Sequence, residues 1–252
     1  MRRYFKEKAI ERAFFDRKCV IFDMNGVIID DEMRHMLAMN RALSVFGVDR
    51  RFDYHTWIRS SLGRPGRVVL RELLPEASEE DLANILGETH REFGKLIAGR
   101  VQTLVRPGFR DVLRHAKALG KRVAVATAAT DEETEIVLGR GGLDIRDEFD
   151  KVVFGEGELL PKPAPDIYLK TLAVLRLKPD QCVALEDSSI GVAAAKAAGL
   201  RCIAAPTDLT RDNDFHEADL VVSSLLGNAA IVAANASGSS GPPWAGGSRP
   251  QP

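Results

Sequence analysis

The sequence predicts an α/β protein: a doubly wound parallel sheet interrupted by an all-helical block. Three observations lead to this fold class. A short apolar run rich in β-branched residues, 19–22, is typical of a buried strand, and an acid follows it. Residues 31–104 show helical periodicity without a convincing strand. From residue 107 onward, short apolar strands alternate with helices, which is the pattern of a parallel sheet covered on both faces.

The opening strand leads directly into a polar turn. Its apolar residues are followed by Asp23, Asn25 and Gly26. Because Asp and Asn are common in turns, Asp23 has two interpretations at this point: a residue that caps the turn, or a functional carboxylate. The choice between them depends on whether other strand ends supply partners for this carboxylate.

Four amphipathic segments make up the block that follows. Apolar residues recur in them at helical spacing, Gly47 ends the first segment, and Ser78 caps the last with Asp81 three residues on. The block lies between two parts of the α/β pattern, so it predicts a helical insertion over 31–104. The expected helices are 31–46, 57–62, 67–74 and 79–97.

The second part of the chain repeats strand and helix. Ligands of such a sheet bind beyond the carboxyl ends of the strands, where the strand order reverses. We therefore expect a Rossmann-like core over 19–30 and 105–235. Its expected strands are 122–127, 151–154, 182–185, 201–204 and 220–222, and its expected helices are 109–119, 131–140, 166–175 and 190–198.

The two ends differ from the core in composition. Residues 1–18 mix charged residues with apolar ones at helix-like spacing, which predicts a short amphipathic N-terminal helix laid on the core. Residues 236–252 are rich in Gly, Ser and Pro and lack an apolar pattern, which predicts a disordered tail with an exposed Trp244.

Composition indicates which kinds of binding partner and which cellular compartment to expect. The 252 residues include 35 basic and 36 acidic ones, so no nucleic-acid partner is indicated. Three widely spaced cysteines are typical of core residues in a reducing compartment. No apolar run approaches the roughly 18 residues of a membrane span, and the N-terminus lacks a signal-peptide core. We expect a cytoplasmic monomer with no nucleic-acid and no membrane partner.

Acidic side chains gather at the predicted strand ends. Several carboxylates in one crevice repel one another unless a cation lies among them, and all-oxygen ligands favour Mg²⁺ over zinc. The alternative for the segment Glu186, Asp187, Ser188 and Ser189 is an acidic N-cap on the helix that begins near Ile190, and both roles are compatible. The residues expected to converge are Asp23, Asn25, Thr127, Glu156, Lys162, Glu186 and Asp187.

The remaining strand-end residues suit a phosphate. The Thr127 hydroxyl and the backbone amides of Ala128 and Ala129 precede a helix start, where an oxyanion binds well. Lys162 stands between prolines that hold its segment rigid, so its ammonium is aimed at a fixed point. Carboxylate, cation, hydroxyl, amides and ammonium together predict phosphoryl transfer through a covalent aspartyl intermediate.

This ordered set resembles the four motifs of the haloacid dehalogenase superfamily, in particular its β-phosphoglucomutase-like phosphatases with a helical, C1-type cap. The resemblance covers about residues 19–205 and rests on 23–26, Thr127, 162–166 and 186–188 with Gly191. It implies that Asp23 is the nucleophile and that Thr127 and Lys162 hold the phosphoryl oxygens. It also implies a magnesium site formed by Asp23, the backbone carbonyl of Asn25, Glu186 and Asp187.

The resemblance also suggests cap residues. His35 falls where relatives of the mutase often carry a histidine, so it is either a hydrogen-bond partner of the site or an ordinary residue of the linker helix. The segment 62–67 resembles the cap loop that reaches over the site, where Arg64 or Arg67 would bind a substrate anion or remain solvated. The other four histidines are expected to be ordinary surface or partly buried residues.

Asn25 departs from the family pattern, which has Asp two positions after the nucleophile. An amide neither donates nor accepts a proton as a carboxyl group does, and general acid–base catalysis contributes about a hundred- to ten-thousand-fold in rate. We expect a magnesium-dependent phosphatase of a small phosphorylated metabolite, such as a sugar phosphate, in which His35, Glu156 or the substrate supplies the proton. The alternatives are a phosphosugar mutase and a catalytically weakened phosphate-ligand binding or regulatory protein.

Overall fold

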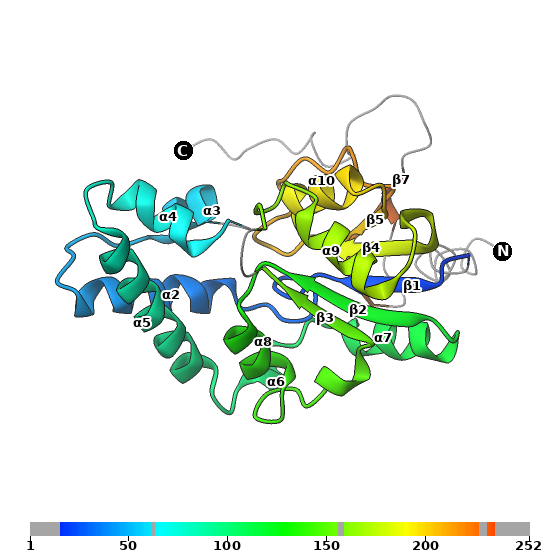
Figure 1. The fold of residues 1–252 in the computed structure, drawn as a ribbon, viewed down its shortest axis with the longest axis horizontal. Helices are drawn as coiled ribbons and strands as arrows, with labels where there is room; N and C mark the ends of the chain where they lie inside the picture. Colours follow the sequence, from blue (N-terminus) through cyan, green and yellow to red (C-terminus); the bar gives the residue numbers. More distant parts are fainter. Residues whose placement is uncertain (1–15, 62–63, 156–158, 227–230, 235–252) are drawn as a thin grey trace, which may run out of the picture.

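The computed structural model describes residues 16–61, 64–155, 159–226 and 231–234. Its centre is a seven-stranded sheet with the order β3-β2-β1-β4-β5-β6-β7, in which β1 to β6 are parallel and β7 pairs antiparallel with β6 (Figure 1). The strands are β1 (Cys19–Phe22), β2 (Arg122–Thr127), β3 (Lys151–Phe154), β4 (Cys182–Glu186), β5 (Arg201–Ala204), β6 (Leu220–Val222) and β7 (Ile231–Ala234).

The helices of the α/β part cover both faces of the sheet. Apolar residues of α7 and α8 pack on one face and those of α9 and α10 on the other, and alternate residues of β1 enter the two apolar clusters. This confirms the doubly wound arrangement. These helices are α6 (Val101–Leu104), α7 (Phe109–Ala118), α8 (Asp131–Leu138), α9 (Asp166–Leu175) and α10 (Ser189–Ala197), with single 3₁₀ turns at Arg146–Glu148 and Pro179–Gln181.

The helices inserted between β1 and β2 have an apolar cluster of their own, which includes Met39, Leu43, Trp57, Leu70 and Ile85. Within the described part of 31–104 there is no strand, as predicted. Figure 1 shows this group beside the sheet, with α2 and α5 running next to each other. The helices are α2 (Glu32–Val45), α3 (Tyr54–Ser61), α4 (Gly66–Leu73) and α5 (Glu79–Ile97).

Local signals explain several element ends. Ser78 and Asp81 form the predicted capping box of α5, with the Asp81 amide 3.0 Å from Ser78 Oγ. The bounds of β2, β3, β5 and β6 match the expected strands exactly, whereas β7 was not expected. The predicted N-terminal helix and C-terminal tail lie outside the described residues, apart from 16–18. Among the described helices, none combines the length and apolar character needed to cross a membrane.

Candidate active site

The strand order places the predicted site at a reversal. From β1 the chain first adds β2 and β3 on one side and later β4 to β6 on the other, so the carboxyl ends of β1 and β4 flank the switch point. Asp23 follows β1 directly, and its backbone amide donates to Leu185 O at 3.0 Å. Asp23 is only 7% exposed. A crevice at these strand ends is lined by residues that include Asp23, Asn25, Ala128, Lys162 and Asp187.

A tight turn after β1 fixes the position of these groups. The Gly26 amide donates to Ile29 O at 2.7 Å, and Gly26 has a φ of 78°, a left-handed conformation that favours glycine. A β-carbon at Gly26 would overlap the Asp187 carboxylate. The turn therefore lies directly against an acidic residue of β4's carboxyl end, and the glycine makes this close approach feasible.

Lys162 joins two carboxylates from different strands. Its buried ammonium lies 2.9 Å from Asp23 Oδ1 and 2.7 Å from Glu186 Oε1. Burial opposes the charge of Lys162, but the two carboxylates outweigh burial and raise its pKa. Lys162 therefore remains a positively charged ammonium. This agrees with the expectation that its charged group points at a fixed position in the site.

The acids carry more negative charge than one ammonium offsets. Burial raises the pKa of Asp23 to about 7, with Glu186 adding to the shift and Lys162 opposing it. Burial, followed by Asp23 and Glu186, raises the pKa of Asp187 well above its usual range. In the absence of a further cation, the ionised forms of Asp23 and Asp187 are therefore disfavoured.

These residues fit a bound divalent cation. One oxygen from each of Asp23, Glu186 and Asp187 lies within 4.8 Å of the others. Glu186 Oε2 is buried and has no hydrogen-bond partner among the described residues. An all-oxygen donor set with no His or Cys suits Mg²⁺. Within the segment 186–189, the residue that caps α10 is Ser188, whose hydroxyl accepts from the Gly191 amide at 3.2 Å, so a capping role for the segment is compatible with a metal role for its two acids.

Asn25 is held by hydrogen bonds on both sides of its amide. The Thr127 hydroxyl donates to Asn25 Oδ1 at 3.4 Å, and Asn25 Nδ2 donates to Asp31 Oδ2 at 2.8 Å. Nδ2 also lies 3.3 Å from His35 Nε2. The predicted residues Asn25, Thr127 and His35 therefore meet, together with Asp31, a buried residue that the sequence did not single out.

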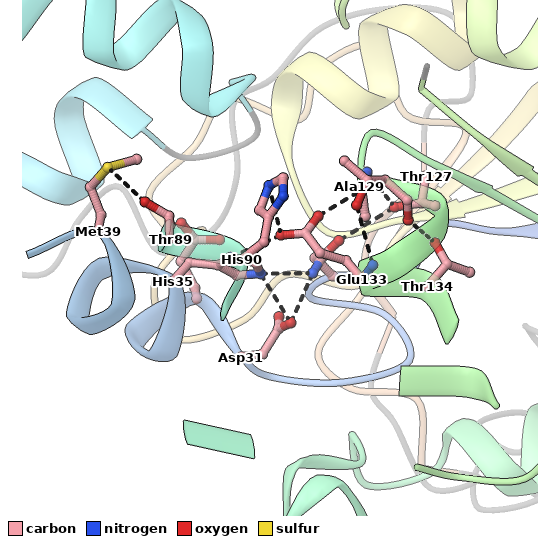
Figure 2. Close-up of polar contacts among 12 residues, drawn as sticks. Asp31, His35, Met39, Thr89, His90, Thr127, Ala129, Glu133 and Thr134 are labelled. Carbon is pink, nitrogen blue, oxygen red and sulfur yellow. Dashed lines mark hydrogen bonds and ion pairs between the residues drawn. The ribbon is translucent and has the colours of Figure 1, made fainter. Parts of the chain in front are cut away.

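His35 belongs to α2 of the helical insertion and faces the core. It ion-pairs with Asp31 at 3.3 Å, its ring stacks on Phe93 with centroids 4.0 Å apart, and Nδ1 lies 3.9 Å from Glu133 Oε1 of α8. Burial lowers the pKa of His35, but Asp31 and Glu133 outweigh it and raise the pKa to about 9. Figure 2 shows His90 of α5 on the same Glu133 carboxylate, at 3.7 Å. Two histidines of the insertion thus contact one acid of the core.

Thr127 and Ala128 lie at the carboxyl end of β2, where the sequence predicts the oxyanion-binding groups. Thr127 ends β2 with no exposed surface, and its hydroxyl accepts from the Ala129 amide at 3.1 Å. This bond shapes the loop that brings Ala128 to the crevice. Glu156 lies outside the described residues.

Comparison with known proteins decides the family. A family model described as haloacid dehalogenase-like hydrolase matches residues 17–199. The chain belongs to the haloacid dehalogenase-like hydrolase family. Protein CbbY of Rhodobacter capsulatus is 34% identical over 208 residues, which cover 80% of this chain and 91% of that protein. A phosphorylated carbohydrates phosphatase of Thermotoga maritima is 33% identical over 186 residues, which cover 74% of this chain and 83% of that protein.

Solved structures agree with this haloacid dehalogenase-like assignment. A CbbY variant from Rhodobacter sphaeroides in complex with xylulose-(1,5)bisphosphate matches with a TM-score of 0.77 and 32% identity, covering 83% of this chain and 95% of that one. A β-phosphoglucomutase from Clostridium difficile matches in fold, with a TM-score of 0.72 and 23% identity over 83% of this chain and 92% of that one. The predicted superfamily and the prediction of a phosphoric monoester hydrolase are confirmed, and the β-phosphoglucomutase structure supports the predicted fold.

The predicted anion-binding arginines of this haloacid dehalogenase-like protein have partners within the insertion. Arg64 makes a two-point contact with Glu72, at 3.0 and 2.5 Å, and Arg67 pairs with Glu79. Neither arginine lines the crevice in this structure. Residues 62 and 63 of the expected cap loop lie outside the described residues.

Three further residues lie near the site although no sequence motif points to them. Arg106 is buried, and its guanidinium donates to the carbonyls of Gly26, Ala205 and Pro206, joining the turn after β1 to the loop after β5. Glu32 lines the crevice and accepts from Trp57 Nε1 at 2.7 Å. Tyr168 donates to Glu186 Oε1 at 2.5 Å. No local motif marks them, because their partners are distant in sequence.

Proposed function

We propose that this chain is a magnesium-dependent phosphatase that hydrolyses a small phosphorylated metabolite through an aspartyl-phosphate on Asp23. The observation that carries the proposal is the buried contact of the Lys162 ammonium with both Asp23 and Glu186. A sugar phosphate is the expected substrate class, because a phosphorylated carbohydrates phosphatase and a CbbY complex with a sugar bisphosphate are among the similar proteins. Cytoplasmic location and a monomeric state stay predictions.

Four groups would hold the magnesium ion: the carboxylates of Asp23, Glu186 and Asp187, and the backbone carbonyl of Asn25. The ion would offset charge on the phosphoryl oxygens and on the crowded acids. The proposal is supported by the closeness of the three carboxylates and by the unpartnered Glu186 Oε2.

Asp23 would act as the nucleophile. One of its carboxylate oxygens attacks phosphorus, the phosphorus–oxygen bond of the ester breaks, and the phosphoryl group is left on Asp23. Water then attacks the same phosphorus atom, which releases inorganic phosphate and restores the carboxylate. Meanwhile the Lys162 ammonium, the Thr127 hydroxyl and the Ala128 amide would hold the phosphoryl oxygens.

Groups other than the Asn25 side chain must donate and accept the protons in these two steps. The leaving oxygen needs a proton and the attacking water must lose one, yet the Asn25 amide does neither. His35 lies 3.3 Å from Asn25 Nδ2 and remains the predicted proton source within the described residues. Helices α2 to α5 would serve as a cap that excludes water from the phosphoryl group.

The test is phosphate release over a panel of sugar, alkyl, acyl and aryl phosphates with and without Mg²⁺. We expect release by the wild type that depends on Mg²⁺, none by Asp23→Ala, and faster release by Asn25→Asp. If the wild type released phosphate from no member of the panel, the proposal would fail.

A second candidate, a phosphate-ligand binding protein, is favoured by one observation. The Asn25 amide is held by Thr127 and Asp31, so the phosphate-binding groups are kept without the carboxyl group that would aid turnover. Tight binding of a phosphometabolite by the wild type, with hydrolysis only in Asn25→Asp, would support this candidate.

A further inference from the structure

Tyr168 of α9 contacts two of the proposed phosphoryl-transfer groups. Its side chain is fully buried among apolar residues of α9, α10 and the sheet. The hydroxyl donates to Glu186 Oε1 at 2.5 Å, and the Lys162 ammonium lies 5.3 Å from the centroid of its ring. One tyrosine therefore contacts both the ammonium and one of the two acids that the ammonium joins.

Packing alone does not explain why a tyrosine hydroxyl is buried at position 168. A phenylalanine would fill nearly the same volume, whereas a buried hydroxyl costs free energy unless it is hydrogen-bonded. Tyr168 meets this requirement with a charged acceptor, Glu186, and a hydrogen bond to a charged group is stronger than one between neutral groups. The pairing is thus a specific contact with the site.

The two oxygens of Glu186 have different hydrogen-bond partners. Its Oε1 accepts from two donors, Tyr168 and Lys162, whereas Oε2 accepts from none among the described residues. Gly191 lies directly against this carboxylate, because a β-carbon there would overlap both of its oxygens. The carboxylate is therefore held by hydrogen bonds to Oε1 and by close packing against Gly191.

The contacts form one continuous series: Tyr168 hydroxyl, Glu186 Oε1, Lys162 Nζ and Asp23 Oδ1. We propose that Tyr168 is a positioning residue, whose hydroxyl fixes Glu186 and thereby aims the Lys162 ammonium at Asp23. The role rests on the proposed function of these groups. Residues that orient metal ligands and charged site residues typically contribute ten- to a hundred-fold in metal affinity or activity.

The test compares Tyr168→Phe with Thr171→Val. Each variant removes one buried hydroxyl from α9, but the Thr171 hydroxyl donates to Ile167 O within the helix and does not touch the site. We expect Tyr168→Phe to lower kcat for phosphate release and the affinity for Mg²⁺ in calorimetric titrations, each about ten- to a hundred-fold. Thr171→Val should change neither. Thermal unfolding of both variants separates a loss of stability from a loss of positioning.

A crystal structure of Tyr168→Phe gives a readout that does not depend on turnover. We expect the Glu186 carboxylate to rotate and its contact with Lys162 to lengthen beyond the 2.7 Å of the wild type. Wild-type kcat and Mg²⁺ affinity in Tyr168→Phe, or an unmoved Glu186–Lys162 contact, would overturn the proposal. If the wild type releases no phosphate, the proposed function fails, and the titration and the crystal structure still decide the role of Tyr168.

Discussion

The Lys162 ammonium lies 2.9 Å from Asp23 Oδ1, although 139 residues separate the two in the chain. Both side chains are buried, and the same ammonium also contacts Glu186. The proposed nucleophile, Asp23, is therefore held in place by an ammonium group from the loop that follows β3.

Replacing Lys162 by Met should strongly destabilise the fold. Two buried carboxylates lose their ammonium, and breaking a buried ion pair in this way costs about 3–5 kcal/mol. Saturating Mg²⁺ should recover part of this loss, because it binds the same acids. Urea unfolding with and without Mg²⁺ measures both effects.

The matched control is Lys196→Met. Lys196 pairs with Asp219 at 2.7 Å, but both side chains are partly exposed, so the loss should be about 0–1 kcal/mol and independent of Mg²⁺. Equal losses in the two variants would contradict the account of Lys162.

Replacing Asn25 by Asp should speed hydrolysis of alkyl phosphates. A carboxyl group at this position supplies the general acid–base step, worth about a hundred- to ten-thousand-fold. Aryl phosphates, whose leaving groups need less protonation, should gain less. Steady-state kinetics on the two ester classes checks the difference, and peptide mass spectrometry checks that wild-type Asn25, which precedes a glycine, has not deamidated to the same residue. An equal gain on both classes would argue against a proton-transfer role for position 25.

Replacing Gly26 by Ala should cost more stability than replacing Gly47 by Ala. Both glycines have positive φ, 78° and 69°, so each substitution carries the backbone cost of about 1–2 kcal/mol. Only Gly26 faces a crowded site, since a β-carbon there overlaps Asp187 whereas Gly47 has open space. Gly26→Ala should also weaken Mg²⁺ binding. The measurements are urea unfolding and calorimetric titration, and indistinguishable variants would refute the close approach of the turn to Asp187.

Replacing Glu32 by Gln should stabilise the protein at neutral pH. Burial raises the pKa of Glu32 above its usual range despite the opposing effects of His35 and Trp57. A raised folded-state pKa means that the wild type loses stability as the pH rises through that pKa, a loss that glutamine avoids. The advantage of Glu32→Gln in unfolding free energy should shrink as the pH falls toward the ordinary range of a glutamate.

Glu92 provides a control of opposite sign for Glu32. Hydrogen bonds from Lys95 and Arg41 lower the pKa of Glu92, so Glu92→Gln should lose stability at neutral pH and converge with the wild type in acid. Unfolding titrations across pH should give the two variants opposite signs. The same sign for both would contradict the burial argument for Glu32.

The sequence was sufficient to predict the fold class and the meeting of the strand-end residues. Short apolar strands alternating with helices determine where strands end, and parallel strands deliver their carboxyl ends to one edge. Asp23, Thr127, Lys162 and Glu186 could therefore be placed together before their contacts were seen. The short strand β7 was missed, because a brief apolar run does not distinguish strand from helix.

The contacts themselves depend on geometry that local patterns do not contain. Asp31 meets Asn25 because α2 starts where the turn after β1 ends, and Tyr168 meets Glu186 because α9 and β4 pack in one apolar cluster on the same face of the sheet. The partner of Arg64 was also not predicted from the sequence. Its position suggested that it binds a substrate anion, but in the structure it forms an ion pair with Glu72. Which charged side chains form ion pairs therefore depends on how close they lie in the folded structure.

The most direct test of the account is detection of the covalent intermediate on Asp23. The wild type is mixed with a sugar phosphate and Mg²⁺, quenched in acid, and treated with borohydride, which reduces an acyl phosphate to the alcohol. We expect homoserine at position 23 by peptide mass spectrometry, and none when Mg²⁺ is chelated. Phosphate release without modification of Asp23, or modification at another residue, would contradict it.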